Sequence, residues 1–370
     1  MEIFRPYGFD KTLFLATLTL IAFGLIMIFS ASAILASDRY HQPFHFYINQ
    51  IWVAALGLVM VFFIVSVRKP FYQTPLFIYG LLSLSIFLLL ACLIMPAIGK
   101  TNRWIQFYGL RFQPSELAKI SLVLFFAFYL DRKKDKLNSF KTLIFPLGVL
   151  FIFIFLILKE PDYGTAILIF IICSIMLFIG GARLFHLLLL GIASLSLFGI
   201  VLFQASYRWE RIFSFLHPEQ DPLRGGFQII QSKLAIGSGG LLGVSIGESS
   251  QKLFYIPCAH TDFIFAIIGE ELGLIGASIL LILFLIFFQR GIVISRKAQN
   301  NFSQIAAAGL SMAIVSQALL NMSIVLGLGP PTGIPLPLIS FGRSSLICTF
   351  FGIGILLHIS QWKGKTRRKK

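Results

Sequence analysis

Long apolar segments separated by short polar gaps make up most of the chain. A helix needs about 20 mostly apolar residues to cross a membrane, and unbroken runs of that kind favour helices over the short alternating strands of a β-barrel. Each run long enough to span is expected to be a transmembrane helix, and there are about ten: 12–35, 49–67, 72–96, 114–131, 141–159, 163–182, 184–205, 262–289, 303–328 and 342–361. The pattern predicts an all-α integral membrane protein, with residues 1–370 forming a single polytopic domain.

Two gaps differ from ordinary connecting loops. The segment 206–261, between the seventh and eighth expected helices, is the longest, and long loops in compact proteins are usually functional. Its stretch GGFQIIQSKLAIGSGGLLG has apolar residues at near-helical spacing and then glycines, which predicts a short amphipathic helix at the membrane interface. The segment 329–341 is too rich in Pro and Gly for a helix, and non-helical backbone at that depth needs protein or a water-filled cavity around it.

Charge sets the expected orientation. The chain is 57% hydrophobic and only 12% charged, whereas soluble domains contain about 25% charged residues, so a soluble globular protein is excluded. The net charge of +16 is concentrated in alternate gaps and in the tail 362–370. This is the positive-inside pattern, which predicts both termini in the cytoplasm and argues against a nucleic-acid partner. The segments on the outer face would then be 36–48, 97–113, 159–162, 206–261 and 329–341.

Common cofactor and catalytic signatures do not occur in the sequence. The four cysteines show no C-x-x-C spacing, so neither a zinc site nor a disulfide framework is expected. The chain also has no G-x-x-x-x-G-K-[ST], H-E-x-x-H or G-x-S-x-G motif.

Two aspartates lie where outer loops enter expected helices. Asp262 follows His260 and Thr261 in CAHTDF, and Asp162 follows a proline in KEPDYGTA. Either aspartate could cap its helix by accepting hydrogen bonds from backbone N–H groups. The dense polar group at Asp262 also favours a general base, with a pKa raised by partial burial. The two carboxylates would then share a polar cavity.

The segment TNRWIQFYGLRFQPSELAKI supplies positive charge. Arg103 and Arg111 lie in an expected outer loop, and guanidinium groups are well shaped to hold phosphate oxygens. Glu116 and Lys119 lie three apart on the next helix, where they form a simple ion pair or face a cavity. Trp104 fits either an interfacial belt position or a substrate contact.

Further polar residues lie near Asp262. Glu270 and Glu271 are inside the same expected helix, and Glu270 is a little over two turns beyond Asp262 on roughly the same face. Glu270 would extend the polar cavity or pair with a basic residue of another helix. The amphipathic segment adds candidate substrate contacts, for which ordinary surface positions are the alternative: Gln231, Ser232 and Lys233.

Five stretches resemble, in order, the signatures of the SEDS family (shape, elongation, division and sporulation). They are RWIQFYGLRFQPSELAKI, EPDYGTA, DPLRGGFQIIQSKLAIGSGGL, QKLFYIPCAHTDFIFAIIGEELG and GIPLPLISFGRSSL, and the likeness covers nearly the whole chain. The resemblance implies a peptidoglycan glycosyltransferase of the bacterial cytoplasmic (inner) membrane that polymerises lipid II at the outer face. It also implies that Asp262 is the essential acidic residue, Asp162 a cavity aspartate and Trp104 an important loop residue.

The resemblance implies partners as well: a class B penicillin-binding protein that crosslinks the strands, and other division or elongation membrane proteins. The stretch around Asp262 looks closer to the division branch, FtsW, whereas GFQIIQSKLAIGSGGL suits the elongation branch, RodA, equally well. In the expected mechanism Asp262 accepts a proton from the acceptor sugar. The departing pyrophosphate needs stabilisation from Arg103, Arg111, Lys119 or a divalent cation such as Mg²⁺ or Mn²⁺.

Two positions depart from the family pattern. Cys258 stands where a glutamate is usual, which removes a carboxylate near Asp262, and Arg343 stands where a glycine is usual. Two other functions stay open: a transporter that flips the lipid-linked precursor, and a scaffold that binds division proteins. A flippase needs polar groups along the full depth of its path, whereas here most of them are expected in the outer half.

Overall fold

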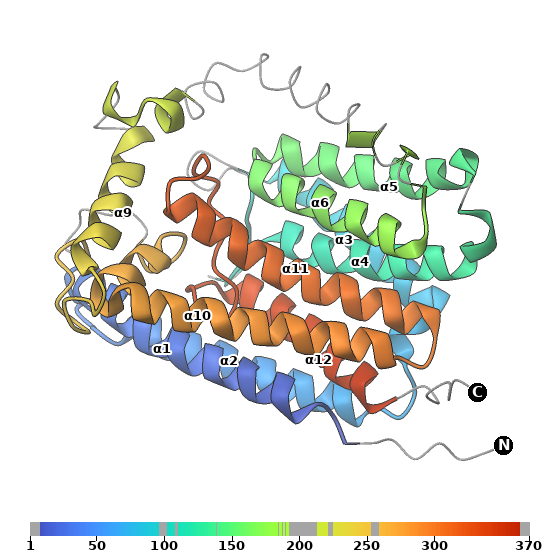
Figure 1. The fold of residues 1–370 in the computed structure, drawn as a ribbon, viewed down its shortest axis with the longest axis horizontal. Helices are drawn as coiled ribbons and strands as arrows, with labels where there is room; N and C mark the ends of the chain where they lie inside the picture. The colour runs from blue at the N-terminus through green and yellow to red at the C-terminus, as the bar shows by residue number, and fades with distance from the viewer. Residues whose placement is uncertain are drawn as a thin grey trace.

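Long helices lie side by side in one bundle, and a shorter helix runs across one end of it (Figure 1). The computed structural model describes residues 8–95, 102–107, 110–137, 139–183, 185–186, 188, 190–191, 213–220, 225–252 and 259–362. The bundle helices are α1 (Lys11–Tyr40), α2 (His45–Ser66), α3 (Pro75–Ile94), α4 (Pro114–Arg132), α5 (Phe140–Lys159), α6 (Tyr163–Gly180), α10 (Ile264–Lys297), α11 (Asn301–Val325) and α12 (Arg343–Gln361).

Eight of the described helices are long and apolar enough to cross a membrane. The remaining bundle helix, α4, has 19 residues and carries Glu116 and Lys119 in its buried part. The apolar windows of α11 and α12 are 78% and 83% buried, against 28% for α2 and for α3. In α4, 15 of the 19 residues are buried. The centre of the bundle is therefore formed by α4, α11 and α12, while α2 and α3 present most of their surface to the surroundings.

The expected helices correspond closely to the described ones. Nine of the ten predicted spans coincide with bundle helices, and the seventh, 184–205, falls largely outside the described residues. Of the basic tail 362–370, only Trp362 is described. The predicted amphipathic helix is confirmed as α9 (Gly225–Gly239), which crosses the end of the bundle (Figure 1). We refer to this end as the α9 end.

The loop before α4 contains structure that the sequence did not predict. Two short strands, β1 (Ile105–Phe107) and β2 (Leu110–Phe112), pair antiparallel, with Gln106 opposite Arg111. Three single-turn 3₁₀ helices occupy other connections: η1 (Phe71–Gln73), η2 (Lys134–Lys136) and η3 (Pro218–Gln220). By contrast, 329–341 contains no helix or strand, as its Pro and Gly content predicted.

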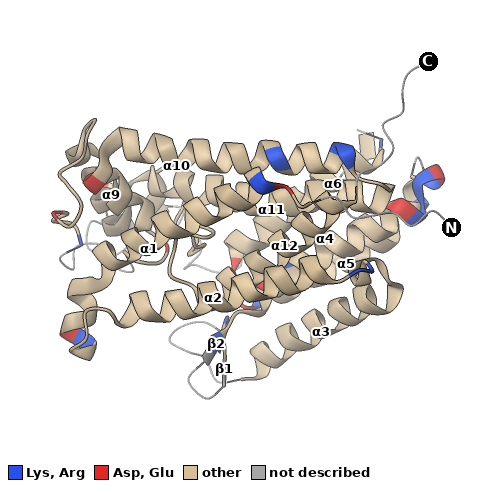
Figure 2. Cartoon of the chain, turned by 90° about the horizontal axis from the view of Figure 1, so that it is seen from below, with Lys and Arg blue, Asp and Glu red and all other residues tan. Residues whose placement is uncertain are grey.

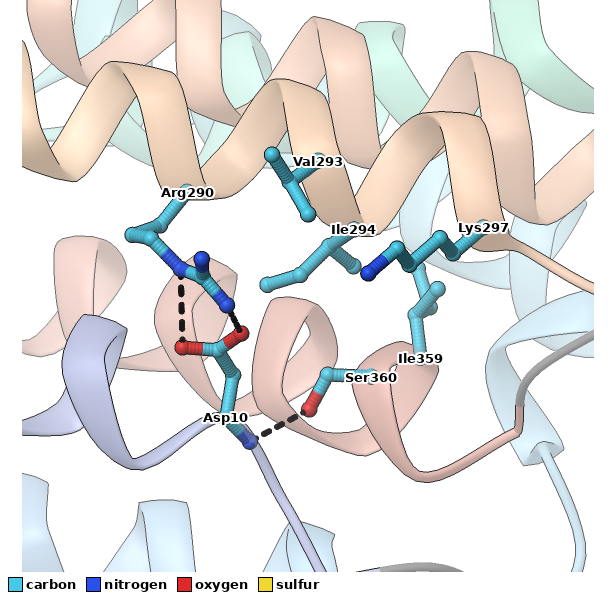
Figure 3. A pocket seen from close by; sticks show the side chains of 7 residues that line it. All are labelled: Asp10, Arg290, Val293, Ile294, Lys297, Ile359 and Ser360. Atoms are coloured by element: carbon cyan, nitrogen blue, oxygen red, sulfur yellow. Dashed lines mark hydrogen bonds and ion pairs between the residues drawn. The ribbon is translucent and has the colours of Figure 1, made fainter.

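The other end of the bundle is closed by a polar contact among three helices (Figure 3). Asp10 caps α1 by accepting a hydrogen bond from Leu13 N at 2.9 Å, and its own N–H donates to Ser360 Oγ of α12 at 2.9 Å. Arg290 of α10 forms an ion pair with the same aspartate, with Nε 3.3 Å from Oδ1. The start of α1 and the end of α12 therefore lie together, opposite α9.

Most charged residues lie at the two ends of the helices, and a small group lies inside the bundle near α4, α12 and the β-hairpin (Figure 2). Because ionisable groups are costly within an apolar bundle, this internal group is the candidate functional region.

Candidate active site

The turn that carries Asp262 is tied down by three successive carbonyl groups. The Asp262 carbonyl accepts a hydrogen bond from Asn321 Nδ2 of α11 at 2.7 Å. The Thr261 carbonyl accepts one from Ser340 Oγ at 2.5 Å, and the His260 carbonyl accepts one from Phe341 N at 3.0 Å. Asp262 is therefore placed by α11 and by the segment 329–341, not only by its own helix.

The non-helical segment 329–341 has its backbone satisfied by buried side chains. Asn321 Nδ2 also donates to the Ile334 carbonyl at 2.8 Å, and Gln317 Nε2 donates to the Pro335 carbonyl at 2.9 Å. From α2, Gln50 Nε2 donates to the Ser340 carbonyl at 3.1 Å. These bonds meet the requirement that irregular backbone at membrane depth be satisfied by surrounding protein.

Gly333 brings this segment against the charged groups. Its φ of 75° is a left-handed conformation that favours glycine. A methyl group built at this position would lie 3.4 Å from Asp262 Oδ2 and 3.5 Å from Arg103 Nη1. The backbone of Gly333 therefore forms a wall beside both Asp262 and Arg103.

Asp262 has the properties expected of a base. The residue is half-buried and its carboxyl is surrounded by protein. Burial raises the pKa of Asp262 to about 6, with a smaller upward effect of Asp162, while Arg103 and a hydrogen bond from Thr261 act in the opposite direction. A base is most effective when its pKa is near the working pH, and this carboxyl is mostly ionised at pH 7.

Asp162 is buried and fully engaged. Its Oδ1 accepts a hydrogen bond from Thr165 N at 3.2 Å, which confirms the predicted cap of α6. Its Oδ2 accepts from Gln113 Nε2 at 3.0 Å and from Ser115 Oγ at 3.3 Å, both at the start of α4. Asp162 also raises the pKa of Asp262, so the two aspartates interact electrostatically, and the polar cavity predicted between them stays a prediction.

Arg103 is the cation described beside Asp262, and it is bound to the turn that precedes Asp162. Its Nε donates to the Glu160 carbonyl at 3.3 Å, and its Nη2 donates to the Pro161 carbonyl. These two bonds fix the guanidinium against the turn between α5 and α6. The remaining nitrogen, Nη1, lies beside Gly333. The charge of Arg103 is therefore available to groups near Asp262.

Glu116 and Lys119 form the predicted i,i+3 pair, with Lys119 Nζ 2.9 Å from Glu116 Oε2 and both side chains buried. Lys119 Nζ also donates to Gln317 Oε1, and Gln317 in turn holds the Pro335 carbonyl. The pair is therefore linked through Gln317 to the backbone of the segment 329–341.

Other predicted residues play different parts. The His260 ring packs 4.6 Å from the Phe46 ring, and burial, with a smaller effect of Arg39, lowers its pKa to about 4, so it is neutral at pH 7. Ser232 Oγ donates to the Gln228 carbonyl within α9 at 2.6 Å.

Four further residues stay candidate substrate contacts without a described hydrogen bond to Asp262, Asp162 or Arg103. Trp104 is half-buried before β1, and Arg111 is exposed on β2. On α9, Gln231 is half-buried, and exposed Lys233 lies beside Gly327.

The described partners of the two glutamates of α10 are residues of α1 and of the 240–252 segment, not Asp262 or Arg103. Glu271 Oε1 lies 3.0 Å from Lys252 Nζ and accepts a hydrogen bond from Ser30 Oγ at 2.7 Å. Glu270 accepts hydrogen bonds from Ser249 Oγ and, at 3.0 Å, from Ser250 N. Both glutamates attach the 240–252 segment to α10, and Glu271 also reaches α1. The predicted pairing of Glu270 with a basic residue of another helix was wrong: Glu271 makes the ion pair, and its partner Lys252 lies in a turn.

Of the two departures from the family pattern, the structure describes one. Cys258 lies outside the described residues, and Arg343 is the half-buried first residue of α12. The described residues contain no group of three His, Cys, Asp or Glu side chains arranged to hold a metal ion. The positive charge described beside Asp262 comes from Arg103, and the divalent cation stays a prediction.

Several residues of the site were missed from the sequence. Gln317 and Asn321, four apart in a mostly apolar helix, lie on one face of α11, and that spacing is a usable signal. Glu160, two residues before Asp162, was visible in EPDYGTA. Nothing in the sequence indicated that Gln113, Ser115 or Gly333 would meet the aspartates, because those contacts join distant segments.

Comparisons with known proteins show the family of this chain. The family model described as "Cell cycle protein" (FtsW, RodA and SpoVE) matches residues 11–365. The chain is 38% identical to the "Probable peptidoglycan glycosyltransferase FtsW" of Geobacter sp. (strain M18), over 96% of this chain and 98% of that protein. It is 39% identical to the stage V sporulation protein E of Bacillus subtilis (strain 168), over 95% and 97%.

A solved structure has the same fold. A chain from a work titled "Structural coordination of polymerization and crosslinking by a peptidoglycan synthase complex" superposes with a TM-score of 0.78 at 28% identity, over 95% of this chain and 97% of that one. The family match and the relatives extend over nearly the full length, so the chain is a multi-pass membrane protein that belongs to the FtsW, RodA and SpoVE family.

Proposed function

We propose that this protein is a peptidoglycan glycosyltransferase that polymerises lipid II into glycan strands, with Asp262 as its general base. The observation that carries the proposal is the enclosed carboxyl of Asp262, with its pKa raised to about 6 beside Arg103. The relatives described as peptidoglycan glycosyltransferases support the same reaction.

In this reaction Asp262 accepts the proton of the acceptor sugar's 4-hydroxyl while that oxygen attacks the anomeric carbon of the growing strand. A new C–O bond forms, the bond to the lipid pyrophosphate breaks, and the anomeric configuration inverts. The leaving pyrophosphate carries away the electron pair, so no nucleotide is consumed. Asp162, held by Gln113 and Ser115, does not need to move a proton.

Charge developing on the pyrophosphate requires a nearby cation. Arg103 is better placed than Lys119, because Lys119 is already paired with Glu116 and Gln317. The N-termini of α4, α6 and α10 also lie around the two aspartates, and helix N-termini favour negative charge. The chain therefore supplies positive potential from both a side chain and its backbone.

We place the protein in the bacterial cytoplasmic membrane, with Asp262 near the outer face and both termini in the cytoplasm. Asp10 and Ser360, close to the first and last described residues, are hydrogen-bonded to each other opposite α9. This contact supports both termini lying on the same side of the membrane. A class B penicillin-binding protein is the proposed partner, because the similar solved chain belongs to a peptidoglycan synthase complex that coordinates polymerisation and crosslinking.

We propose a role in the division branch. The FtsW relative and the FtsW-like stretch around Asp262 support this branch. The sporulation relative is as similar, at 39% identity, and an elongation role of the RodA kind is the alternative.

The first test is lipid II polymerisation by the purified protein together with its cognate penicillin-binding protein, inactivated at the crosslinking serine. Asp262→Ala and Asp262→Asn should lose activity by about 100-fold or more, because a general base typically contributes that much. Folding and partner binding of both variants are checked in parallel.

Glycan strands from the wild type and none from the folded variants would establish the reaction and the base. Equal strands from wild type and variants would contradict Asp262 as the base and direct attention to Asp162. A wild-type complex without strands that moves labelled lipid II across vesicles would favour the flippase alternative. If it does neither, the scaffold alternative would be favoured.

A further inference from the structure

A buried carboxyl beside the site has no hydrogen-bond partner among the described residues. Glu160 lies in the turn between α5 and α6 with its side chain 0% exposed. Within the described part of the chain, neither of its carboxyl oxygens has a hydrogen-bond partner. Its backbone carbonyl accepts the bond from Arg103 Nε, so the guanidinium is bound to the main chain of Glu160, not to its acid.

The groups around Glu160 do not neutralise it. Arg103 comes from the segment before β1, and Asp162 is the cap of α6. Cys92 of α3 is also within electrostatic range, and its thiol donates to the Asn102 carbonyl at 3.0 Å. The neighbouring Lys159 side chain lies over the Phe155 ring, 5.4 Å from its centre. No ion pair with Glu160 is present among the described residues.

An ionised carboxylate that is buried without partners is strongly disfavoured, and such a group binds a proton instead. Burial first, and then the charge of Asp162, raise the pKa of Glu160 to about 8, against a smaller lowering effect of Arg103. Glu160 is therefore a neutral acid at pH 7, next to the hydrogen-bonded carboxylate of Asp162.

We propose that Glu160 is a positioning residue that has to stay protonated for glycosyl transfer, because as a neutral acid it leaves the charge of Arg103 to Asp262 and to the departing pyrophosphate. This inference rests on the proposed function. An ionised Glu160 would compete for the Arg103 guanidinium. It would also add a negative charge beside Asp162, where the leaving group develops its own negative charge.

The experiment is the pH dependence of lipid II polymerisation by the complex in vesicles. Wild-type activity should rise as Asp262 ionises near pH 6 and fall as Glu160 ionises near pH 8. The rate at pH 9 should then be about tenfold below that at pH 7, because ionisation one unit above the pKa leaves about a tenth of the acid form.

Two variants remove the titration in different ways. Glu160→Gln keeps the shape and a polar neutral group, and Glu160→Met fills the space with apolar atoms. Both should remain active at pH 7 and lose the fall of activity above pH 8. Glu248→Gln, at an exposed glutamate of the 240–252 segment, is the matched control and should keep the wild-type profile.

A second measurement does not depend on activity. Infrared difference spectra between pH 7 and pH 9 should show loss of the carbonyl band of a protonated carboxylic acid in the wild type, and no such loss in Glu160→Gln. The proposal is overturned if the wild type shows no loss of that band between pH 7 and pH 9, or if Glu160→Gln shows the same loss. It is also overturned if both folded variants are inactive at pH 7, or if both retain the alkaline fall. A wild type that shows the band but makes no strands would refute the proposed function and leave the protonation of Glu160 standing.

Discussion

Three acidic residues near one another at the candidate site have different surroundings. Asp162 accepts three hydrogen bonds, Asp262 is enclosed beside Arg103, and Glu160 is buried without a described partner. Surroundings of this kind separate the roles of chemically similar groups, because a carboxylate bound by donors stays fixed while one shifted by burial exchanges protons. At the scale of the residue, therefore, the surroundings of each carboxyl, and not its residue type, favour Asp262 as the proposed base.

Arg103→Gln should test this arrangement through the acid limb of the pH profile. Arg103 lowers the pKa of Asp262, so removing its charge should raise that pKa and move half-maximal activity from about pH 6 to a higher pH. The maximal rate should also fall by about 10²–10³-fold, the usual effect of deleting one group that stabilises charge in the transition state. Steady-state rates of strand formation across pH measure both quantities.

A control for this prediction is Arg68→Gln, at an exposed arginine after α2. It removes the same charge far from the site and should leave the profile unchanged. An Arg103→Gln profile with the wild-type acid limb would show that Arg103 does not act on Asp262.

At the scale of the element, α10 is interrupted where it meets the segment after α9. Gly273 has φ 62° and ψ −162°, a conformation that only glycine adopts readily. The N–H groups that follow are taken up by this segment, as Leu274 N donates to the Gly240 carbonyl at 2.9 Å. In return, Val244 N donates to the Glu270 carbonyl at 3.0 Å. At the break, therefore, backbone groups of α10 form hydrogen bonds with the 240–252 segment instead of within the helix.

Gly273→Ala should destabilise the protein. The methyl group would lie 2.5 Å from Gly243 N, and the backbone conformation alone costs about 1–3 kcal/mol for a residue with a side chain. The measurement is thermal unfolding in detergent.

Gly80→Ala in α3 is the matched control, since nothing lies within 4 Å of a methyl group there. It should be neutral or slightly stabilising, because alanine is a better helix former than glycine. Equal unfolding temperatures for the two variants would contradict this account of the break.

At the scale of the whole molecule, the two ends of the bundle are held by ion pairs of different kinds. Near the α9 end, the pair between Glu271 and Lys252 is buried, with side chains 0% and 5% exposed. At the opposite end, the pair between Asp10 and Arg290 is partly open to solvent, with side chains 11% and 32% exposed. Breaking a buried pair is costly because one charge is left without compensation, whereas exposed pairs contribute little.

Glu271→Gln should therefore lower the free energy of unfolding by about 3–5 kcal/mol, and Asp10→Asn by less than about 1 kcal/mol. The double variant Glu271→Gln with Lys252→Met should recover part of the loss, because the uncompensated charge is removed. Denaturation in mixed detergent micelles measures all three. A similar loss for both single variants would show that burial does not distinguish the two pairs.

Much of this molecule follows directly from the sequence. Apolar runs determined the bundle helices, because backbone groups inside a membrane must be hydrogen-bonded within their own segment. Local rules likewise determined the Asp162 cap, the Glu116–Lys119 pair and the irregular backbone of 329–341. Each of these features depends on residues close together in the chain.

Only the tertiary structure decided which polar groups meet. The contacts of Asp262 with Asn321 and of Asp162 with Gln113 join residues 59 and 49 positions apart. The withdrawal of Glu270 and Glu271 from the site and the isolation of the Glu160 carboxyl also depend on neighbours from other segments. Apolar periodicity determines which face of a helix is buried, but not which partner a polar group on that face will find. That partner is set by how the helices pack, and packing determines the pKa values on which the proposed chemistry depends.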